Sequence, residues 1–233
     1  MGDEQTGLTG ALHRALEKAI SIQRSPVAGH VARLRRARPN ATPAEIIAVL
    51  EKQYLTAVTG TGAAVGGAAA MPGVGTVAAL TISGGETVVF LAATALFALA
   101  AAEVHGIRVD EIERRRTLIL AIVLGDSGAI LVEKVTGRTS QHWGELLPDV
   151  IPMSSIAAIN TTLGRWFLTR YGRKLGVLAF GRVAPFGIGA VIGAAGNRAL
   201  GRTVVHTSQR VFGPPPARFT DDGPVMIIDS TAD

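Results

Sequence analysis

The chain contains no cysteine among its 233 residues. Disulfide frameworks, thiolate metal sites and cysteine nucleophiles are therefore excluded. Aromatic residues make up only 5% of the chain and charged residues only 18%, whereas a typical soluble domain is about one quarter charged. The scarcity of aromatic rings argues against a binder of single-stranded nucleic acid, because such proteins stack bases on aromatic side chains.

Small and aliphatic residues dominate what is present. Apolar residues account for 48% of the chain, there are 28 glycines, and the mean hydropathy of +0.34 is high for a soluble protein. The net charge of +5 favours anionic partners such as phospholipid headgroups. The first ten residues, MGDEQTGLTG, do not resemble a secretory signal peptide. We therefore expect a location in a bacterial cytoplasm or on the cytoplasmic face of the inner membrane.

Two long segments carry no charge. The first runs from Gln53 to Gly85 and the second, after Glu86, from Thr87 to Ala102. Such segments must be buried in the protein's own core, in a partner or in lipid. The choice between these three environments is the main functional question that the sequence raises.

The apolar pattern is helical throughout and predicts an all-α fold, a multi-helix bundle of about ten helices with Gly/Ala-rich apolar helices at its centre. Thr42-Pro43-Ala44-Glu45 predicts a helix start with a capping box. Breaks are expected at Pro72-Gly73 and Gly84-Gly85. Gly125 and Gly128 weaken the helix pattern in the middle of Asp110–Val132.

Three parts are expected along the chain. Residues 1–52 form amphipathic and basic helices, and residues 53–212 form the helical domain with its apolar segments. Residues 213–233, which begin GPPPARFTDDGP, are polar and proline-rich, so we expect a disordered tail.

None of the apolar segments is a clean membrane span of about 20 residues. Two arrangements in lipid are possible: a hairpin with arms Tyr54–Met71 and Thr87–Val104, or helices lying in the interface. The segment Val183–Val205 is a second candidate for insertion. The residues expected to contact the membrane are Arg33, Arg35, Arg36, Arg38, Arg114, Arg115 and Arg116 at the headgroups and Phe90, Leu91, Leu96 and Phe97 in the apolar layer.

Glycine spacing also predicts close helix packing, since Gly62 and Gly66, and again Gly189 and Gly193, stand four residues apart. Four acids lie in apolar sequence: Glu86, Glu103, Asp126 and Glu133. We expect these acids to face water or to pair with arginines on neighbouring helices. The alternative is a polar or ion-conducting lining between helices.

No catalytic or cofactor site is predicted. Gly125-Asp126-Ser127-Gly128 is similar to a serine-protease nucleophile turn, but it stands in an apolar helical context without a placed histidine, so a helix break is expected instead. The glycines around Gly187 follow no strand, which excludes a dinucleotide loop. The histidines have no metal-ligand spacing. We expect no enzyme activity, no metal and no cofactor.

A second glycine-rich block carries the most specific pattern, in Pro185, Gly187, Gly189, Gly193 and Asn197, and with Pro72, Gly73 and Gly75 it is expected to form a helix-packing motif. Together with Pro72, Gly73 and Gly75 and with Glu86 and Glu103–Gly106, it resembles the bacterial EcsC family over roughly Tyr54 to Phe212. The resemblance implies an all-helical, membrane-associated bacterial protein without an established activity, and it supplies no catalytic residues.

The leading hypothesis is therefore a non-enzymatic, membrane-associated protein that binds anionic lipids, with a membrane protein or a second copy as a further partner, and not nucleic acid. One alternative is a soluble helical module for interaction or oligomerisation. Another is a pore-like element built from the glycine-spaced helices.

Overall fold

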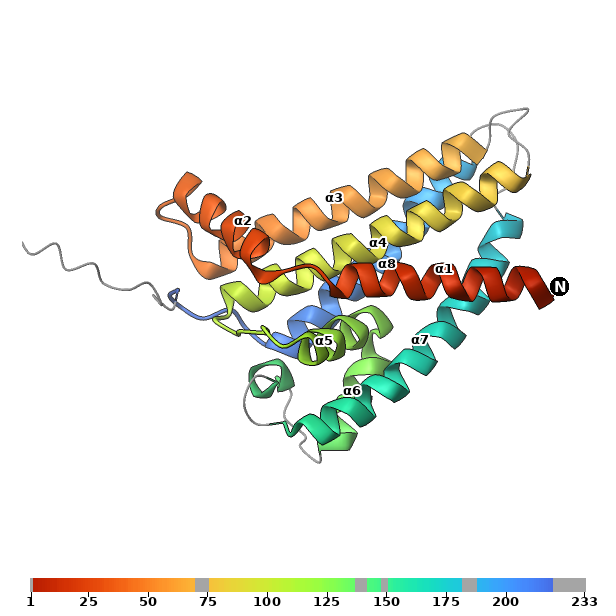
Figure 1. Ribbon diagram of the computed structural model, residues 1–233. Coiled ribbons are helices and arrows are strands. Elements are labelled where there is room, and N and C mark those ends of the chain that lie inside the picture. The colour runs from red at the N-terminus through yellow and green to blue at the C-terminus, as the bar shows by residue number, and fades with distance from the viewer. Residues whose placement is uncertain (1, 70–75, 137–141, 148–150, 182–187, 220–233) are drawn as a thin grey trace, which may run out of the picture.

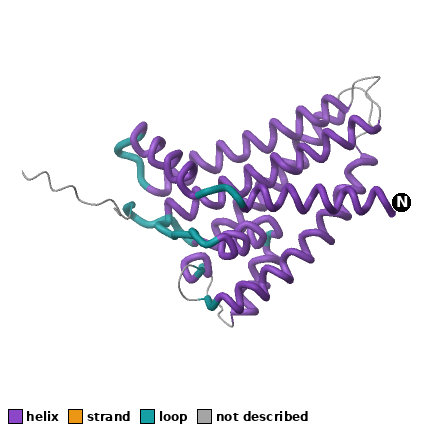
Figure 2. Tube along the Cα trace, in the orientation of Figure 1, coloured by secondary structure: helices purple, strands orange, loops and turns teal. Residues whose placement is uncertain are grey.

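The computed structural model describes residues 2–69, 76–136, 142–147, 151–181 and 188–219, and every regular element in these ranges is a helix (Figures 1 and 2). The expected all-α fold is confirmed. In chain order the elements are α1 (Gly2–Ile20), α2 (Arg24–Ala37), α3 (Pro43–Ala69), α4 (Thr76–Val104), α5 (Ile112–Leu124), α6 (Asp126–Thr136), the 3-10 helix η1 (Trp143–Leu146), α7 (Met153–Gly181) and α8 (Ile188–Phe212).

One helix is longer than the sequence pattern predicts. α4 continues through Gly84 and Gly85, so the prediction of a break there is wrong. A glycine inside a helix costs only about 1 kcal/mol relative to alanine. It also keeps its backbone N–H and imposes no ring clash, unlike proline, so the surrounding helix formers prevail.

The helix α4 is the centre of the bundle, because α1, α2, α3, α5, α7 and α8 all pack against it. Leu91, Thr94, Ala95 and Ala98 on this helix are fully buried. A helix that is apolar on all sides is expected in a protein interior. Much of the second uncharged segment is therefore covered by the protein's own helices.

The helices α3 and α4 form an antiparallel pair (Figure 1). Near the start of α3, the Tyr54 hydroxyl lies 2.9 Å from the Thr94 hydroxyl of α4, and its ring stacks on Phe97 with centroids 4.9 Å apart. The two apolar arms therefore pack against each other, as the hairpin arrangement requires. Its apex, with Pro72, Gly73 and Gly75, lies outside the described residues.

The N-terminal helices belong to the same core as the rest of the chain. Leu12 and Ile20 of α1 and Val31 of α2 are buried in one cluster that extends to Phe212 of α8. The helices before residue 52 therefore share one hydrophobic core with the rest of the described residues, although the sequence suggested a boundary there.

Local sequence signals set two helix boundaries. The Thr42 backbone N–H donates to Glu45 Oε2 at 2.7 Å and the Glu45 N–H donates to Thr42 Oγ1 at 3.3 Å, which confirms the capping box. Gly125, with a φ of 70°, separates α5 from α6, so the expected helix break is found there. A positive φ of this size favours glycine over residues with a Cβ.

The segment after α8 does not leave the protein at once. Gly213 turns the chain with a φ of 76°, and Phe219 is partly buried against the core cluster. The chain therefore stays in contact with the protein beyond Gly213, since Gly213 is buried and Phe219 packs against the core. Residues 220–233 lie outside the described residues.

Candidate membrane-facing end and a pocket at the opposite end

The helices α3 and α8 pack closely against each other. A Cβ built on Gly62 would fall 2.8 Å from the carbonyl carbon of Gly193 and 2.9 Å from Nδ2 of Asn197, and nearer still to the Gly193 carbonyl oxygen. The buried Asn197 side chain donates to the Val58 carbonyl oxygen at 3.1 Å. The predicted role of Gly62 and Gly193 in close packing is confirmed, and Asn197 joins the same interface.

The contact between α3 and α8 brings the charge-poor segments of the chain close together. α3 and α8 run antiparallel, since Glu51 bonds Gln209 at one end and Gly62 meets Gly193 at the other. The C-terminal end of α3 and the N-terminal ends of α4 and α8 consequently lie together at one end of the molecule (Figure 1). We call this the Gly-rich end.

An apolar surface is exposed at the Gly-rich end. Val191 of α8 is 70% exposed, and Ala64 of α3 is also exposed. Gly189 lies in the first turn of α8, while Pro185 and Gly187 lie outside the described residues. Val191 and Ala64 thus present apolar side chains to the surroundings, and the segment Gln53–Gly85 contains no charged residue.

One helix in the described part of the chain is long and apolar enough to cross a membrane. Its window, Thr87–Val104, has a mean hydropathy of 2.1, and 61% of it is buried inside the protein. Phe90, Leu91 and Phe97 are among the buried residues, so they serve the protein core, whereas Leu96 is 45% exposed. Of the four expected apolar membrane contacts, only Leu96 is available at the surface.

The arginines at the start of α5 bind the protein itself. Arg114 donates to the carbonyl oxygens of Leu147 and of Ile151, the latter at 3.0 Å, and its Nε reaches Glu111 at 2.7 Å. Both Arg114 and Arg115 are buried. The expectation that these two contact headgroups is therefore corrected, because their guanidinium groups donate to backbone carbonyl oxygens inside the protein.

The neighbouring side chains continue the same network. Arg115 donates to the Ile22 carbonyl at 2.8 Å and to the Asp110 carbonyl at 2.9 Å. Arg116, half-buried, pairs with Glu17 of α1 at 2.8 Å. The sequence reasoning missed this role. The sequence did carry one signal for it. The three arginines stand near the start of a helix, where the helix dipole is unfavourable for cations, so they need acceptors elsewhere in the protein.

The arginines of α2 and Arg38, which follows its last residue, lie far from the Gly-rich end. Arg33, Arg36 and Arg38 are exposed, and the Arg35 guanidinium lies 4.0 Å from the ring centroid of Phe219. Figure 1 places α2 beside the start of α3, at the opposite end of the bundle. The sequence alone suggested a basic cluster adjoining the apolar hairpin, but the structure separates the two by much of the length of α3.

Three of the four acids in apolar sequence pair with arginines, as expected. Glu103 bonds Arg24 at 2.8 Å, and Arg210 lies 3.4 Å from Asp126 and 3.5 Å from Glu133. The side chain of Glu86 lies outside the described residues. Each of these three ion pairs links two helices near the protein surface.

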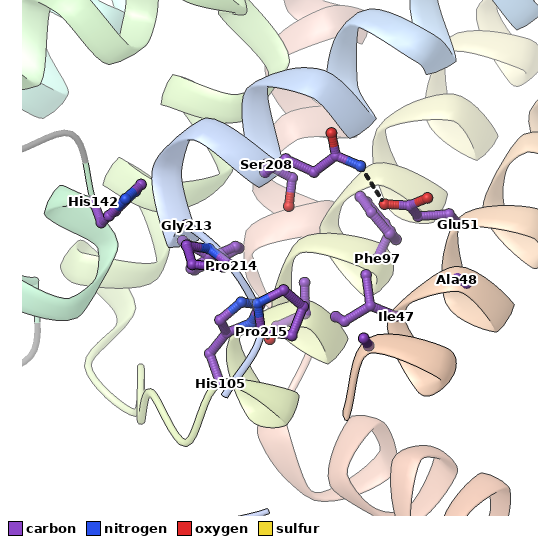
Figure 3. Close-up of a pocket in the computed structure, with 14 residues that line it drawn as sticks. Ile47, Ala48, Glu51, Phe97, His105, His142, Ser208, Gly213, Pro214 and Pro215 are labelled. Carbon is purple, nitrogen blue, oxygen red and sulfur yellow. Dashed lines mark hydrogen bonds between the residues drawn. The ribbon is translucent and has the colours of Figure 1, made fainter. Parts of the chain in front are cut away.

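A cavity of about 440 Å³ lies between the start of α3 and the ends of α4 and α8 (Figure 3). Its walls are mainly apolar, with Ile47, Phe97 and Phe212 among them, and Pro214 and Pro215 close one side. The hydrogen bond between Glu51 and Gln209 crosses its rim at 2.8 Å. Sequence reasoning had no signal for this cavity, because its walls come from segments distant in the chain.

The polar groups of this cavity are mostly engaged within the protein. His105 Nδ1 lies 2.8 Å from the Ala101 carbonyl, and the His105 ring stacks on Phe212 at 5.2 Å. His142 Nδ1 lies 3.2 Å from the Arg210 carbonyl. Within the described ranges, no three histidine or carboxylate side chains are grouped closely enough to hold a metal ion.

Comparisons of the chain with protein-family models, with curated proteins and with solved structures found no match.

Proposed function

We propose that this protein is a non-enzymatic, membrane-associated protein of EcsC type that attaches to the cytoplasmic face of the bacterial inner membrane by inserting its Gly-rich end. The observation that supports the proposal is the contact of Gly62 with Gly193. Because of it, two charge-poor segments that are far apart in the sequence meet at one end of the molecule.

The length of the uncharged surface favours partial insertion. The uncharged part of α3, from Gln53 to Ala69, is about 25 Å long at 1.5 Å per residue. A hydrocarbon core is roughly 30 Å thick, so this arm enters the bilayer without crossing it. The start of α1 lies at the same end of the molecule (Figure 1), so the proposed inserting surface is the side formed by α3, α4 and α8.

The attachment is mainly hydrophobic. Arg114 and Arg115 are buried, and the exposed arginines of α2 lie at the opposite end from the inserting surface. Exposed charges interact through solvent and are screened by salt beyond about 10 Å at 0.1 M ionic strength. High salt is therefore expected to release little of the protein from membranes. A substitution that removes apolar contact between the Gly-rich end and the lipid is expected to release much of it.

The test is fractionation after expression in a bacterial host, with membranes washed first in high salt and then in alkaline carbonate. We expect the protein in the membrane pellet after salt. Val191→Glu is expected to move it to the soluble fraction, because a charge in the apolar layer costs about 2.5–3.5 kcal/mol. The matched control is Ile130→Glu on α6, which makes the same change at an exposed residue outside the Gly-rich end and is expected to leave the pellet fraction unchanged.

A soluble helical interaction module is the second candidate, and the burial of 61% of Thr87–Val104 favours it. In that case the wild-type protein appears in the soluble fraction, and Val191→Glu and Ile130→Glu behave alike. Either result contradicts membrane insertion. Leakage of dye from anionic vesicles on addition of the protein would instead identify the pore-like element.

A further inference from the structure

The exposed side of α8 changes from apolar to basic along the helix. Val191, which is 70% exposed, and Ala195 lie nearest the Gly-rich end. Arg198 and Arg202 follow them and are also exposed. At about 100° per residue, these four positions fall within an arc of about 60° around the helix axis. One face of a single helix therefore presents apolar side chains first and two guanidinium groups after them.

Both arginines of this face are open to an anionic partner. The sequence of α8 contains no acidic residue, and its third arginine, Arg210, is already paired with Asp126 and Glu133 of α6. Among the described residues, no carboxylate forms an ion pair with Arg198 or Arg202. The positive charge of these two side chains is therefore not neutralised within that part of the protein.

The neighbouring helix α3 has no charge at the same level. A Cβ built on Gly201 would fall 2.9 Å from Cγ2 of Val58, so Arg198 and Arg202 stand beside the uncharged part of α3. The residues of α8 before Arg198 are uncharged as well. Along the paired helices α3 and α8, Arg198 is consequently the first charged residue met on the way from the Gly-rich end into the molecule.

The spacing along α8 matches the depth of an interfacial insertion. At 1.5 Å per residue, Arg198 lies about 10 Å and Arg202 about 16 Å beyond Val191. Apolar helix faces at membrane surfaces are buried by about 5–10 Å, and an arginine keeps its charged group among the headgroups while its methylene groups cover apolar surface. With Val191 in the acyl layer, the two guanidinium groups reach the level of the headgroups.

We propose that Arg198 and Arg202 bind the phosphate groups of anionic phospholipids when the Gly-rich end enters the membrane. This inference rests on the proposed function, and it adds the class of lipid and the depth at which insertion stops. A guanidinium group offers paired N–H donors that fit the oxygen atoms of a phosphate. The apolar contact remains the main source of attachment, and the two arginines make that attachment selective for anionic lipid.

The first test measures the partition of the full-length protein onto vesicles of neutral phosphatidylcholine and onto vesicles that also contain anionic phosphatidylglycerol. Arg198→Gln/Arg202→Gln is expected to bind the anionic vesicles about 25-fold more weakly than the wild type, at about fivefold for each arginine. It is expected to bind the neutral vesicles as the wild type does. The matched control is Arg33→Gln/Arg36→Gln on α2, which removes the same charge at the opposite end of the bundle and is expected to change binding by less than about twofold, because of screening.

The outcomes separate this inference from the proposed function. No loss of anionic binding in Arg198→Gln/Arg202→Gln, or an equal loss in both double variants, would overturn the headgroup contact and leave insertion of the Gly-rich end intact. A wild-type protein that binds neither kind of vesicle would contradict the proposed function, and this inference with it. Both arginines are exposed, so unchanged thermal unfolding is expected and shows that a loss of binding is not a loss of fold.

The second test measures depth along α8. Because the chain has no cysteine, Val191→Cys, His206→Cys and the control Ile130→Cys on α6 can each carry one environment-sensitive fluorophore at an exposed position. On anionic vesicles, the label at position 191 is expected to shift to the blue, while those at 206 and 130 keep their emission in water. A shift at 206 as large as that at 191 would show that α8 enters beyond its arginines and would overturn the proposed depth. No shift at any position would contradict insertion itself.

Discussion

Gly62 of α3 and Gly193 of α8 face each other so closely that a Cβ on Gly62 would fall 2.8 Å from the Gly193 carbonyl carbon. The backbones of the two helices are therefore in contact, with no side chain between them. The crossing holds the ends of two charge-poor segments together and is the structural basis of the Gly-rich end.

Gly62→Ala should destabilise the protein by about 1–3 kcal/mol, the usual cost of overpacking a close contact. The added methyl group meets backbone atoms of α8, which cannot rotate away. The control is Gly60→Ala on the same helix, where a Cβ meets nothing within 4 Å. That variant should be neutral or stabilised by about 0.5–1 kcal/mol through helix propensity. Urea unfolding followed by circular dichroism measures both, and equal effects would contradict the close crossing.

Arg114→Met should cost about 2–4 kcal/mol, because it removes the guanidinium donor from the buried Leu147 and Ile151 carbonyl oxygens. Arg33→Met makes the same chemical change at an exposed position on α2 and should stay within about 0.5 kcal/mol of the wild type. Thermal unfolding of the two variants gives the comparison. If Arg114→Met proved as stable as Arg33→Met, the carbonyl-binding role of Arg114 would be wrong.

Thr42→Ala should cost about 1 kcal/mol, since it removes the side-chain acceptor for the Glu45 backbone N–H. Glu45→Gln keeps a side-chain oxygen for the Thr42 N–H and should cost less. Chemical denaturation of both variants tests the capping box. A larger loss in Glu45→Gln than in Thr42→Ala would show that the carboxylate charge near the helix N-terminus matters more than the cap.

Tyr54→Phe should cost about 0.5–1.5 kcal/mol, the net value of one buried hydrogen bond. The hydroxyl bonds Thr94 across the α3–α4 interface, while the ring stacking on Phe97 is kept. Tyr54→Ala removes both and should cost about 3–5 kcal/mol, as for other large-to-small changes in a core. Equilibrium unfolding separates the two contributions. Equal costs would mean that the ring contributes nothing to the pairing of the two helices.

Helix positions follow from local chemistry and were predictable from the sequence. The apolar periodicity, the capping box at Thr42 and Glu45, and the break at Gly125 depend on neighbouring residues alone, and the structure confirms them. The prediction failed at Gly84-Gly85, where the helix-breaking tendency of glycine is weaker than the helix preference of its surroundings.

The partners of charged side chains were not predictable, because they come from distant segments. The sequence shows Arg114 and Arg115 next to Arg116 as a basic cluster, yet two of the three are buried against carbonyls of other elements. The same applies to the cavity beside His105, whose walls are contributed by α3, α4, α8 and the segment after it.

What the sequence determined by itself is the composition of the surfaces: uncharged glycine-rich segments, a basic α2 and an acidic C-terminal segment. What only the tertiary structure decided is where these surfaces lie relative to one another. The pairing of Gly62 with Gly193 places the uncharged segments at one end, and the contact of Arg35 with Phe219 brings the last described residue to the basic helix. The physical reason is that periodicity and capping act over a few residues, whereas packing and charge pairing depend on which distant helices meet.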